Sequence, residues 1–212
     1  MARVRYLERA DLAPAHQPLY DAIAASRGGV PPNFKALRHS PVASARLAVL
    51  GAYVRFETPL PARIKALALL TAAREAEGGS VWAMHQPQAR SAGLGEDIIN
   101  AIRERRAPDG LVPEETSIVQ CTLELLWQHR IADATFQAVQ HRLGDAGVID
   151  LLMLIGYDHR LAHTLGALEV GPPPGVLSTL SRSGRAAEPV RGLVDACEAC
   201  ARLVRPVATF TC

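Results

Sequence analysis

The stretch GGSVWAMHQPQARSAG, residues 78–93, contains the side chains best suited to chemistry. Residues three positions apart share a helix face, so Trp82 and His85 are expected to be neighbours. An apolar indole disfavours the charged imidazole, and a neutral histidine is the form that a general base needs. Pro87 has no N–H and frees the carbonyl of Ala83 to bind a ring N–H or a water. The pattern predicts an acid/base site at His85, and the alternative is a pair of large core residues.

Two further side chains are candidates for substrate binding. Arg55, in YVRFETPLP, has a planar guanidinium that can clamp a carboxylate, although an arginine near a helix end is more often a surface or dipole partner. Tyr157 belongs to the last long apolar segment, which also carries His159 and His163. Two histidines four residues apart can chelate zinc, but no third ligand accompanies them. We therefore expect core or interface roles for them and no metal or other cofactor.

The elements that must position these residues are all expected to be helices. The expected helices run from Leu19 to Ser26, from Pro41 through Phe56, from Pro61 to Glu75, through the stretch quoted above, over GLGEDIINAIRER, from Pro113 to Gln128, from Ala132 to Leu143, and from Ala146 to about Leu168. The segment VPPNFKALRHS is expected to cross between elements. The apolar positions that follow helical spacing in the second helix are Val42, Ala45, Val49, Ala52 and Phe56. No segment shows sustained period-2 alternation, which indicates an all-α fold.

Composition excludes several classes of protein. The 212 residues are 49% hydrophobic and 21% charged, and the formal net charge of +2 provides no basic surface for a run of phosphates. We therefore expect no nucleic-acid partner. No stretch approaches the roughly 18 apolar residues of a membrane span, and the first residues contain no apolar signal segment. These observations predict a cytoplasmic protein that does not bind membranes.

The C-terminal part reads as a linker followed by a tail. Residues 171–189 are rich in Pro, Gly and Ser, and a final short helix is expected from Val190 to Val204, within a tail formed by residues 190–212. The tail contains Cys197 and Cys200 in a C-x-x-C motif, which can support thiol exchange. No histidine follows the motif at the spacing of a peroxidase site. We therefore interpret it as an incidental feature of the tail, and a redox or metal role is the less favoured hypothesis.

The segment from Leu60 to Ile102 resembles the core of the carboxymuconolactone decarboxylase family, which shares its fold with alkylhydroperoxidase D-like proteins. The matching features are Arg63-Ile64-Lys65, the apolar helix after it, and the W..H...A...G pattern of Trp82, His85, Ala89 and Gly93. A weaker likeness extends over roughly residues 20 to 170. The resemblance implies an alkylhydroperoxidase D-like helical bundle over residues 1–170, a pocket beside the family histidine, and an obligate homo-oligomer, commonly a trimer or hexamer.

Two departures from the family pattern bear on function. The peroxidase branch has a C-x-x-C pair on this helix, and here Gly78 and Val81 stand at those positions. A thiol peroxidase is therefore disfavoured. The family also places a glutamate where this chain has Ala66, which puts the usual acid/base carboxylate in doubt. Glu75 or Glu77 is a possible substitute, although both fit solvated surface charges better.

Two functions remain open from the sequence. The first is a cofactor-free lyase that acts on a small, carboxylated lactone or cyclic substrate, with His85 as acid/base, Arg55 as anchor, and Trp82 and Tyr157 among the substrate-binding residues. Lactone hydrolysis, dehydration or isomerisation would use the same groups. The second is a ligand-binding or scaffold oligomer that has lost chemistry. A cavity beside His85 with a second polar group in reach would favour the enzyme.

Overall fold

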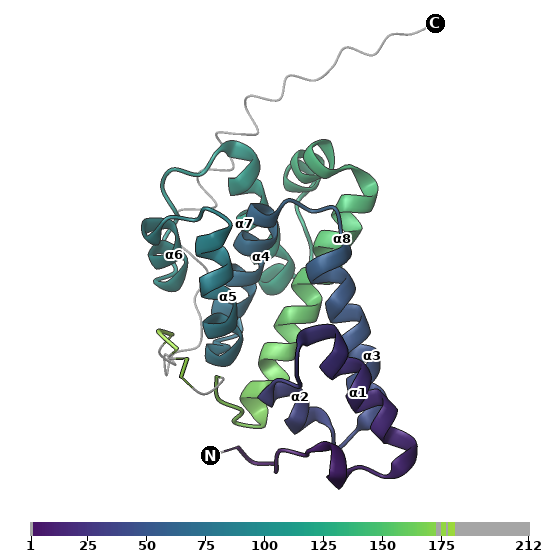
Figure 1. Cartoon of the computed structure of the whole chain (residues 1–212). Helices are drawn as coiled ribbons and strands as arrows, with labels where there is room; N and C mark the ends of the chain where they lie inside the picture. The colour runs from purple at the N-terminus through teal and green to yellow at the C-terminus, as the bar shows by residue number, and fades with distance from the viewer. Residues whose placement is uncertain (1, 173–174, 177, 181–212) are drawn as a thin grey trace, which may run out of the picture.

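The computed structural model describes residues 2–172, 175–176 and 178–180, and the regular elements in this part of the chain are helical (Figure 1). Two short 3-10 turns precede the first helix. The helices are α1 (Gln17–Arg27), α2 (Pro32–Leu37), α3 (Pro41–Ala52), a π-helical turn η3 (Tyr53–Glu57), α4 (Ala62–Glu75), α5 (Gly79–Ser91), α6 (Glu96–Arg103), α7 (Pro113–Gln128) and α8 (Asp133–Ala167). The expected all-α fold is confirmed for these residues.

Helix α4 lies at the centre of the bundle. It packs against α5, α6, α7 and α8, and its side chains are buried on every face from Ala66 to Arg74. The sequence alternates leucines with alanines, and the alanines let neighbouring helices approach closely. The prediction that this helix is buried between neighbours is confirmed, and the helices that carry the candidate site are held against one rigid support.

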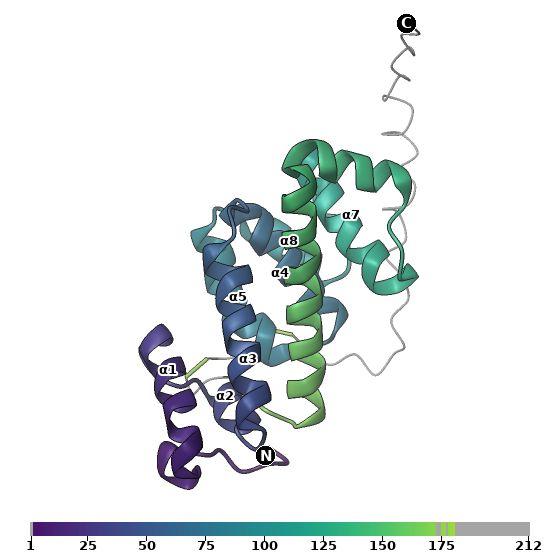
Figure 2. The ribbon, with the colours of Figure 1, turned by 90° about the vertical axis from the view of Figure 1, so that its right-hand side faces the viewer.

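Helix α8 is the longest element and contains a break at Gly144. The backbone there has φ 67° and ψ 174°, a conformation that suits glycine and interrupts the helix. The two helices expected on either side of residues 144–145 are therefore confirmed as two arms of one element. The longer arm runs along much of the molecule (Figure 2), with α3 beside one face and α4 and α5 beside another (Figure 1).

The apolar positions at helical spacing do not form the inner face of α3. Val42, Val49 and Phe56 are 48%, 72% and 66% exposed, and the buried positions are the small residues Ser44, Ala48 and Gly51. Apolar spacing could not distinguish these faces, because the helix is apolar on more than one side. A side chain at Gly51 would lie 2.1 Å from the hydroxyl oxygen of Tyr157, so close packing against α8 selects the small residues.

The remaining elements largely follow the sequence. The helix expected from Leu19 to Ser26 is α1, which ends at Gly28 with a left-handed φ of 69°. The segment expected only to cross between elements instead contains α2, because Pro31 and Pro32 suit a helix start. The expected helix from Val190 to Val204, with Cys197 and Cys200, lies outside the described residues. Within the described ones, no helix combines the length and hydrophobicity needed to cross a membrane.

Candidate active site

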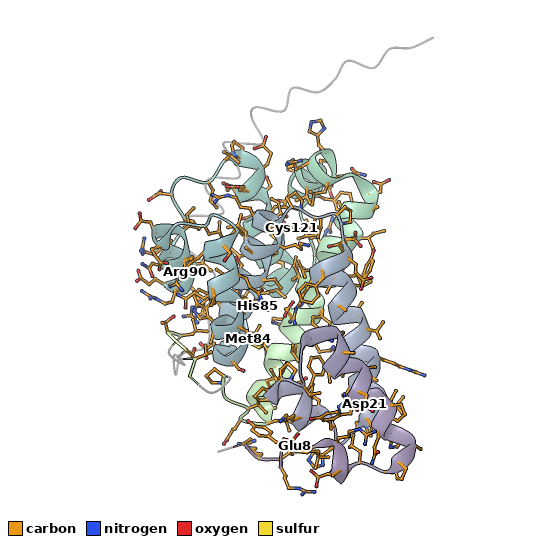
Figure 3. The ribbon with its side chains drawn as sticks, in the orientation of Figure 1. Glu8, Asp21, Met84, His85, Arg90 and Cys121 are labelled. Atoms are coloured by element: carbon orange, nitrogen blue, oxygen red, sulfur yellow. The ribbon has the colours of Figure 1, made fainter. Side chains whose placement is uncertain are left out.

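His85 is buried where α5 meets α8. Its side chain points from α5 towards the bundle interior, as Figure 3 shows, and the residue is 3% exposed. Nε2 lies 3.2 Å from Oδ1 of Asp158 on α8, and Nδ1 lies 2.9 Å from Oε1 of Gln88 on the next turn of α5. Both ring nitrogens therefore have polar partners, and the ring orientation is fixed from two sides.

Arg55 reaches the same cluster from the chain that follows α3. It continues the inward row of Ser44, Ala48 and Gly51 into the π-helical turn. Its guanidinium forms an ion pair with Oδ1 of Asp158 and lies 4.9 Å from the centre of the Tyr157 ring. Segments η3, α5 and α8 thus converge on one carboxylate.

Lys65 is anchored beside this cluster through the backbone. In a continuous helix the carbonyl of Arg55 would accept from the residue four positions later, but that residue is Pro59, which has no N–H. The carbonyl instead accepts a hydrogen bond of 3.0 Å from Nζ of Lys65 on α4. Among the described residues, no carboxylate lies within ion-pairing distance of this ammonium group.

A cavity of about 190 Å³ opens at this point, and polar groups converge on it. Its polar lining residues are His85, Gln88, Arg55 and Lys65. The apolar part of the lining comes from η3, from α4 and from the residue that follows α5, and it consists of Phe56, Ala62, Ala66, Leu69 and Ala92. The criterion set by the sequence, a cavity beside the histidine with a second polar group in reach, is met. A larger groove of about 480 Å³ between α1 and α3 is mainly apolar and contains no histidine.

Charge compensation stabilises the buried cluster. Burial alone would raise the pKa of Asp158, but the charge of Arg55 and the contact with His85 outweigh it and hold that pKa below its ordinary value. Burial works against the Arg55 cation, whereas Asp158 raises the pKa of Arg55. Burial also raises the pKa of Tyr157. At neutral pH the cluster therefore contains one carboxylate and one guanidinium whose charges cancel.

The other residues expected at the site have different surroundings. Trp82 is fully buried, and its indole N–H donates a 3.0 Å hydrogen bond to Oγ1 of Thr179, in the segment expected to be linker. Neither Trp82 nor Tyr157 is among the residues lining the cavity beside His85. The imidazole binds Gln88 and Asp158, so of the two partners considered for the freed Ala83 carbonyl, a ring N–H and a water, the ring N–H is not the one found. Direct substrate contact by Trp82 or Tyr157 stays a prediction.

The backbone at the start of α5 lies very close to α8. A side-chain carbon at Gly78 would lie 2.6 Å from Cβ of Ala162 on α8, well inside contact distance. Val81, one turn further along, is fully buried. The two positions that hold thiols in the peroxidase branch therefore form part of an apolar helix contact in this chain.

Asp158 is the site residue that sequence reasoning missed, although a signal was present. It lies at core spacing on α8, between the buried Leu154 and Leu161. A charged residue at such a position is costly unless a partner compensates it. The position of Asp158 therefore indicates a residue with a compensating partner. In the structure that partner is Arg55.

The histidine pair on α8 lies apart from this cluster. The rings of His159 and His163 are 4.2 Å apart and meet edge to face. No group of three metal-binding side chains is found among the described residues. This pair therefore offers no complete set of ligands within that part of the chain.

The architecture is that of the alkylhydroperoxidase D-like fold. Two crystal structures of the debrominase Bmp8 are similar to this chain, each at 14% identity. A cysteine-to-alanine variant bound to 2,3,4-tribromopyrrole has a TM-score of 0.61, with 92% of this chain and 96% of that chain covered. The apo form has a TM-score of 0.63, with 81% and 92% covered.

A third similar structure comes from Ralstonia eutropha JMP134. It is the alkylhydroperoxidase AhpD core of an uncharacterized peroxidase-related protein, with a TM-score of 0.61 at 12% identity over 82% of this chain and 93% of that one. No family model and no curated protein matches the sequence. At these identities the likeness establishes the fold and leaves the activity to be argued from the site.

Proposed function

We propose that the protein is a cofactor-free enzyme that uses His85 as an acid/base on a small carboxylated substrate. The observation that carries the proposal is a buried imidazole on the wall of a cavity that is also lined by Lys65. An imidazole can take up and return a proton, and a cation can hold an anionic group of the substrate. The resemblance to carboxymuconolactone decarboxylases favours a lactone or cyclic acid.

Two types of reaction are compatible with a proton donor and acceptor at His85, and decarboxylation is the first. When the C–C bond to the carboxylate breaks, CO2 leaves and its bonding electron pair stays on the substrate carbon as a carbanion or enolate. The protonated His85 ring then gives its proton to that carbon and regains one from water. In an isomerisation or dehydration, the neutral ring removes a proton first and returns it later. Lys65 supplies a positive charge that can bind an anionic group of the substrate throughout the reaction.

The roles of the two cations differ in this proposal. Arg55 is already paired with Asp158, so its main task is to hold that carboxylate in place. Lys65 is paired only with a backbone carbonyl among the described contacts, so it is the better candidate to bind the substrate carboxylate. A direct contact between Arg55 and substrate, as expected from the sequence, remains compatible with its place in the cavity wall.

A screen with lactones, β-keto acids and hydroperoxides tests the reaction class. We expect turnover of a carboxylated substrate, and in Lys65→Met we expect KM to rise about ten- to hundredfold with kcat little changed, because a uniformly binding charge is lost. Lys35→Met is the matched control, because Lys35 pairs with Glu8 on the surface. An unchanged KM in Lys65→Met would remove Lys65 from substrate binding.

A scaffold or ligand-binding oligomer is the second candidate, and one observation favours the oligomer that both candidates share. Exposed apolar side chains lie on adjoining faces of α3 and α8, which Tyr53 and Asp150 connect by a 2.9 Å hydrogen bond. Val49, Ile149 and Met153 are 72%, 58% and 52% exposed. We propose that this surface forms a subunit contact of a trimer or hexamer. Light scattering that shows a stable monomer at micromolar concentration would contradict it.

A further inference from the structure

We propose that Asp158 supplies, from α8, the carboxylate that the family pattern places at Ala66, and that it holds His85 in the form protonated on Nε2 with Nδ1 towards the cavity. The effect on turnover rests on the proposed function. The effect on the ring itself does not. Asp158 is thus a positioning residue, which acts on the substrate only through His85.

Asp158 has two nitrogen neighbours, one from Arg55 and one from His85. Its Oδ1 accepts from the guanidinium of Arg55 and lies 3.2 Å from Nε2 of His85. An ionised carboxylate has no proton to donate, so it can only accept. Arg55 keeps Asp158 ionised in a fully buried position, and the lowered pKa of Asp158 agrees with that. Nε2 must therefore carry the hydrogen of this contact.

The second ring nitrogen is then the one available for proton transfer. With Nε2 protonated, the neutral ring has its lone pair on Nδ1, which faces the side chain of Gln88, 2.9 Å away. Gln88 is exposed and lines the cavity, so its amide is able to turn over. Its NH2 group can donate to the neutral ring, and its oxygen can accept from the protonated ring. Gln88 can thus form a hydrogen bond with both the neutral and the protonated His85 ring.

Ala66 leaves space in the cavity beside His85. Ala66 lines the same cavity from α4, where a longer acidic side chain would occupy part of the space. Asp158 approaches His85 from α8 and is not among the residues that line the cavity. With Asp158 on α8 and Ala66 on α4, His85 still has a carboxylate partner, and only the methyl group of Ala66 stands at the cavity wall. We infer that this arrangement makes room for substrate next to Nδ1.

Nitrogen NMR of the histidine ring tests the proposal without any substrate. The seven histidines are labelled with ¹⁵N, and the His85 signals are those missing from His85→Gln. At a pH where the ring is neutral, we expect wild-type His85 to be protonated on Nε2. In Asp158→Asn the charge is gone and an N–H donor is present, so we expect the Nδ1-protonated form to increase. A wild-type ring protonated on Nδ1 overturns the proposal even if the variant does not fold.

A matched control and the kinetics complete the experiment. Asp150→Asn changes another buried carboxylate of α8, one bonded to Tyr53, and should leave the His85 tautomer unchanged. With a substrate in hand, Asp158→Asn should lower kcat about a hundred- to ten-thousand-fold and change KM little. An unaltered tautomer in Asp158→Asn overturns the positioning role alone. A normal tautomer response, with full activity in His85→Gln, overturns only the proposed function.

Discussion

Helices α5 and α8 meet in two places, and the two contacts are opposites. At the start of α5, Gly78 packs so tightly against Ala162 that an added side-chain carbon would clash with it. Two turns further along α5, His85 meets Asp158, and this contact is polar and borders a cavity. One helix pair thus combines a position that only glycine fits, Gly78, with a region where a buried charge is compensated.

The contrast shows what kind of chemistry this scaffold can support. Thiols at positions 78 and 81 would have to displace α8 or enter a fully buried apolar contact. The polar region needs no such change, because Arg55 and Asp158 neutralise each other there. The packing leaves no space for a side chain at Gly78, whereas the contact at His85 already combines polar groups with a cavity.

The largest expected effect comes from breaking the charge compensation. Asp158→Leu leaves the Arg55 guanidinium buried without its partner, so we expect a loss of about 3–5 kcal/mol in the free energy of unfolding. The double variant Arg55→Leu, Asp158→Leu removes both charges and should recover most of that loss. Urea denaturation measures both. A loss below about 1 kcal/mol in the single variant would show that the pair is not shielded from water.

The tight contact between Gly78 and Ala162 can also be tested by urea denaturation. Gly78→Ala brings a carbon to 2.6 Å from Cβ of Ala162, and we expect a cost of about 1–3 kcal/mol. Ala162→Gly in the same chain should relieve it. Gly156→Ala is the control on α8, where the added carbon meets no atom within 4 Å and should stabilise the helix by about 0.5–1 kcal/mol. An equally neutral Gly78→Ala would mean that the contact has room for a side chain.

A smaller effect should appear in the dependence of stability on pH. Burial, together with His163, lowers the pKa of His159 from 6.5 to about 4. Between these values the unfolded chain binds a proton that the folded chain does not, so stability falls as pH decreases from about 6.5 towards 4. The ring is partly exposed, and we expect about 1–2 kcal/mol. His159→Gln should flatten this part of the curve, and an unchanged slope would assign the acid sensitivity to other groups.

The sequence was sufficient for the fold because its signals are local. Prolines and glycines mark most helix boundaries, and the break at Gly144 was expected from the glycine itself. The family-like pattern around His85 predicted the cavity. The inner face of α3 could not be predicted from apolar spacing, because Gly51 is buried to make room for Tyr157, a residue more than 100 positions later.

The site was only half predictable for the same reason. His85 belongs to a local motif, and Arg55 was selected for its charge. Their shared partner Asp158 comes from a distant helix, so only the three-dimensional structure could connect the three. Lys65 was quoted as part of a motif, but its place in the cavity depends on Pro59, which frees the carbonyl that Lys65 binds.

The rate of turnover in His85→Gln tests the central claim most directly. With a substrate from the screen, and with assembly and helix content confirmed by sedimentation and circular dichroism, we expect kcat to fall about a hundred- to ten-thousand-fold. His163→Gln is the control, because His163 is an exposed histidine of α8 away from the cavity, and it should keep wild-type kcat. A folded His85→Gln protein that retains most of its kcat would contradict the account and leave His85 as a packing residue.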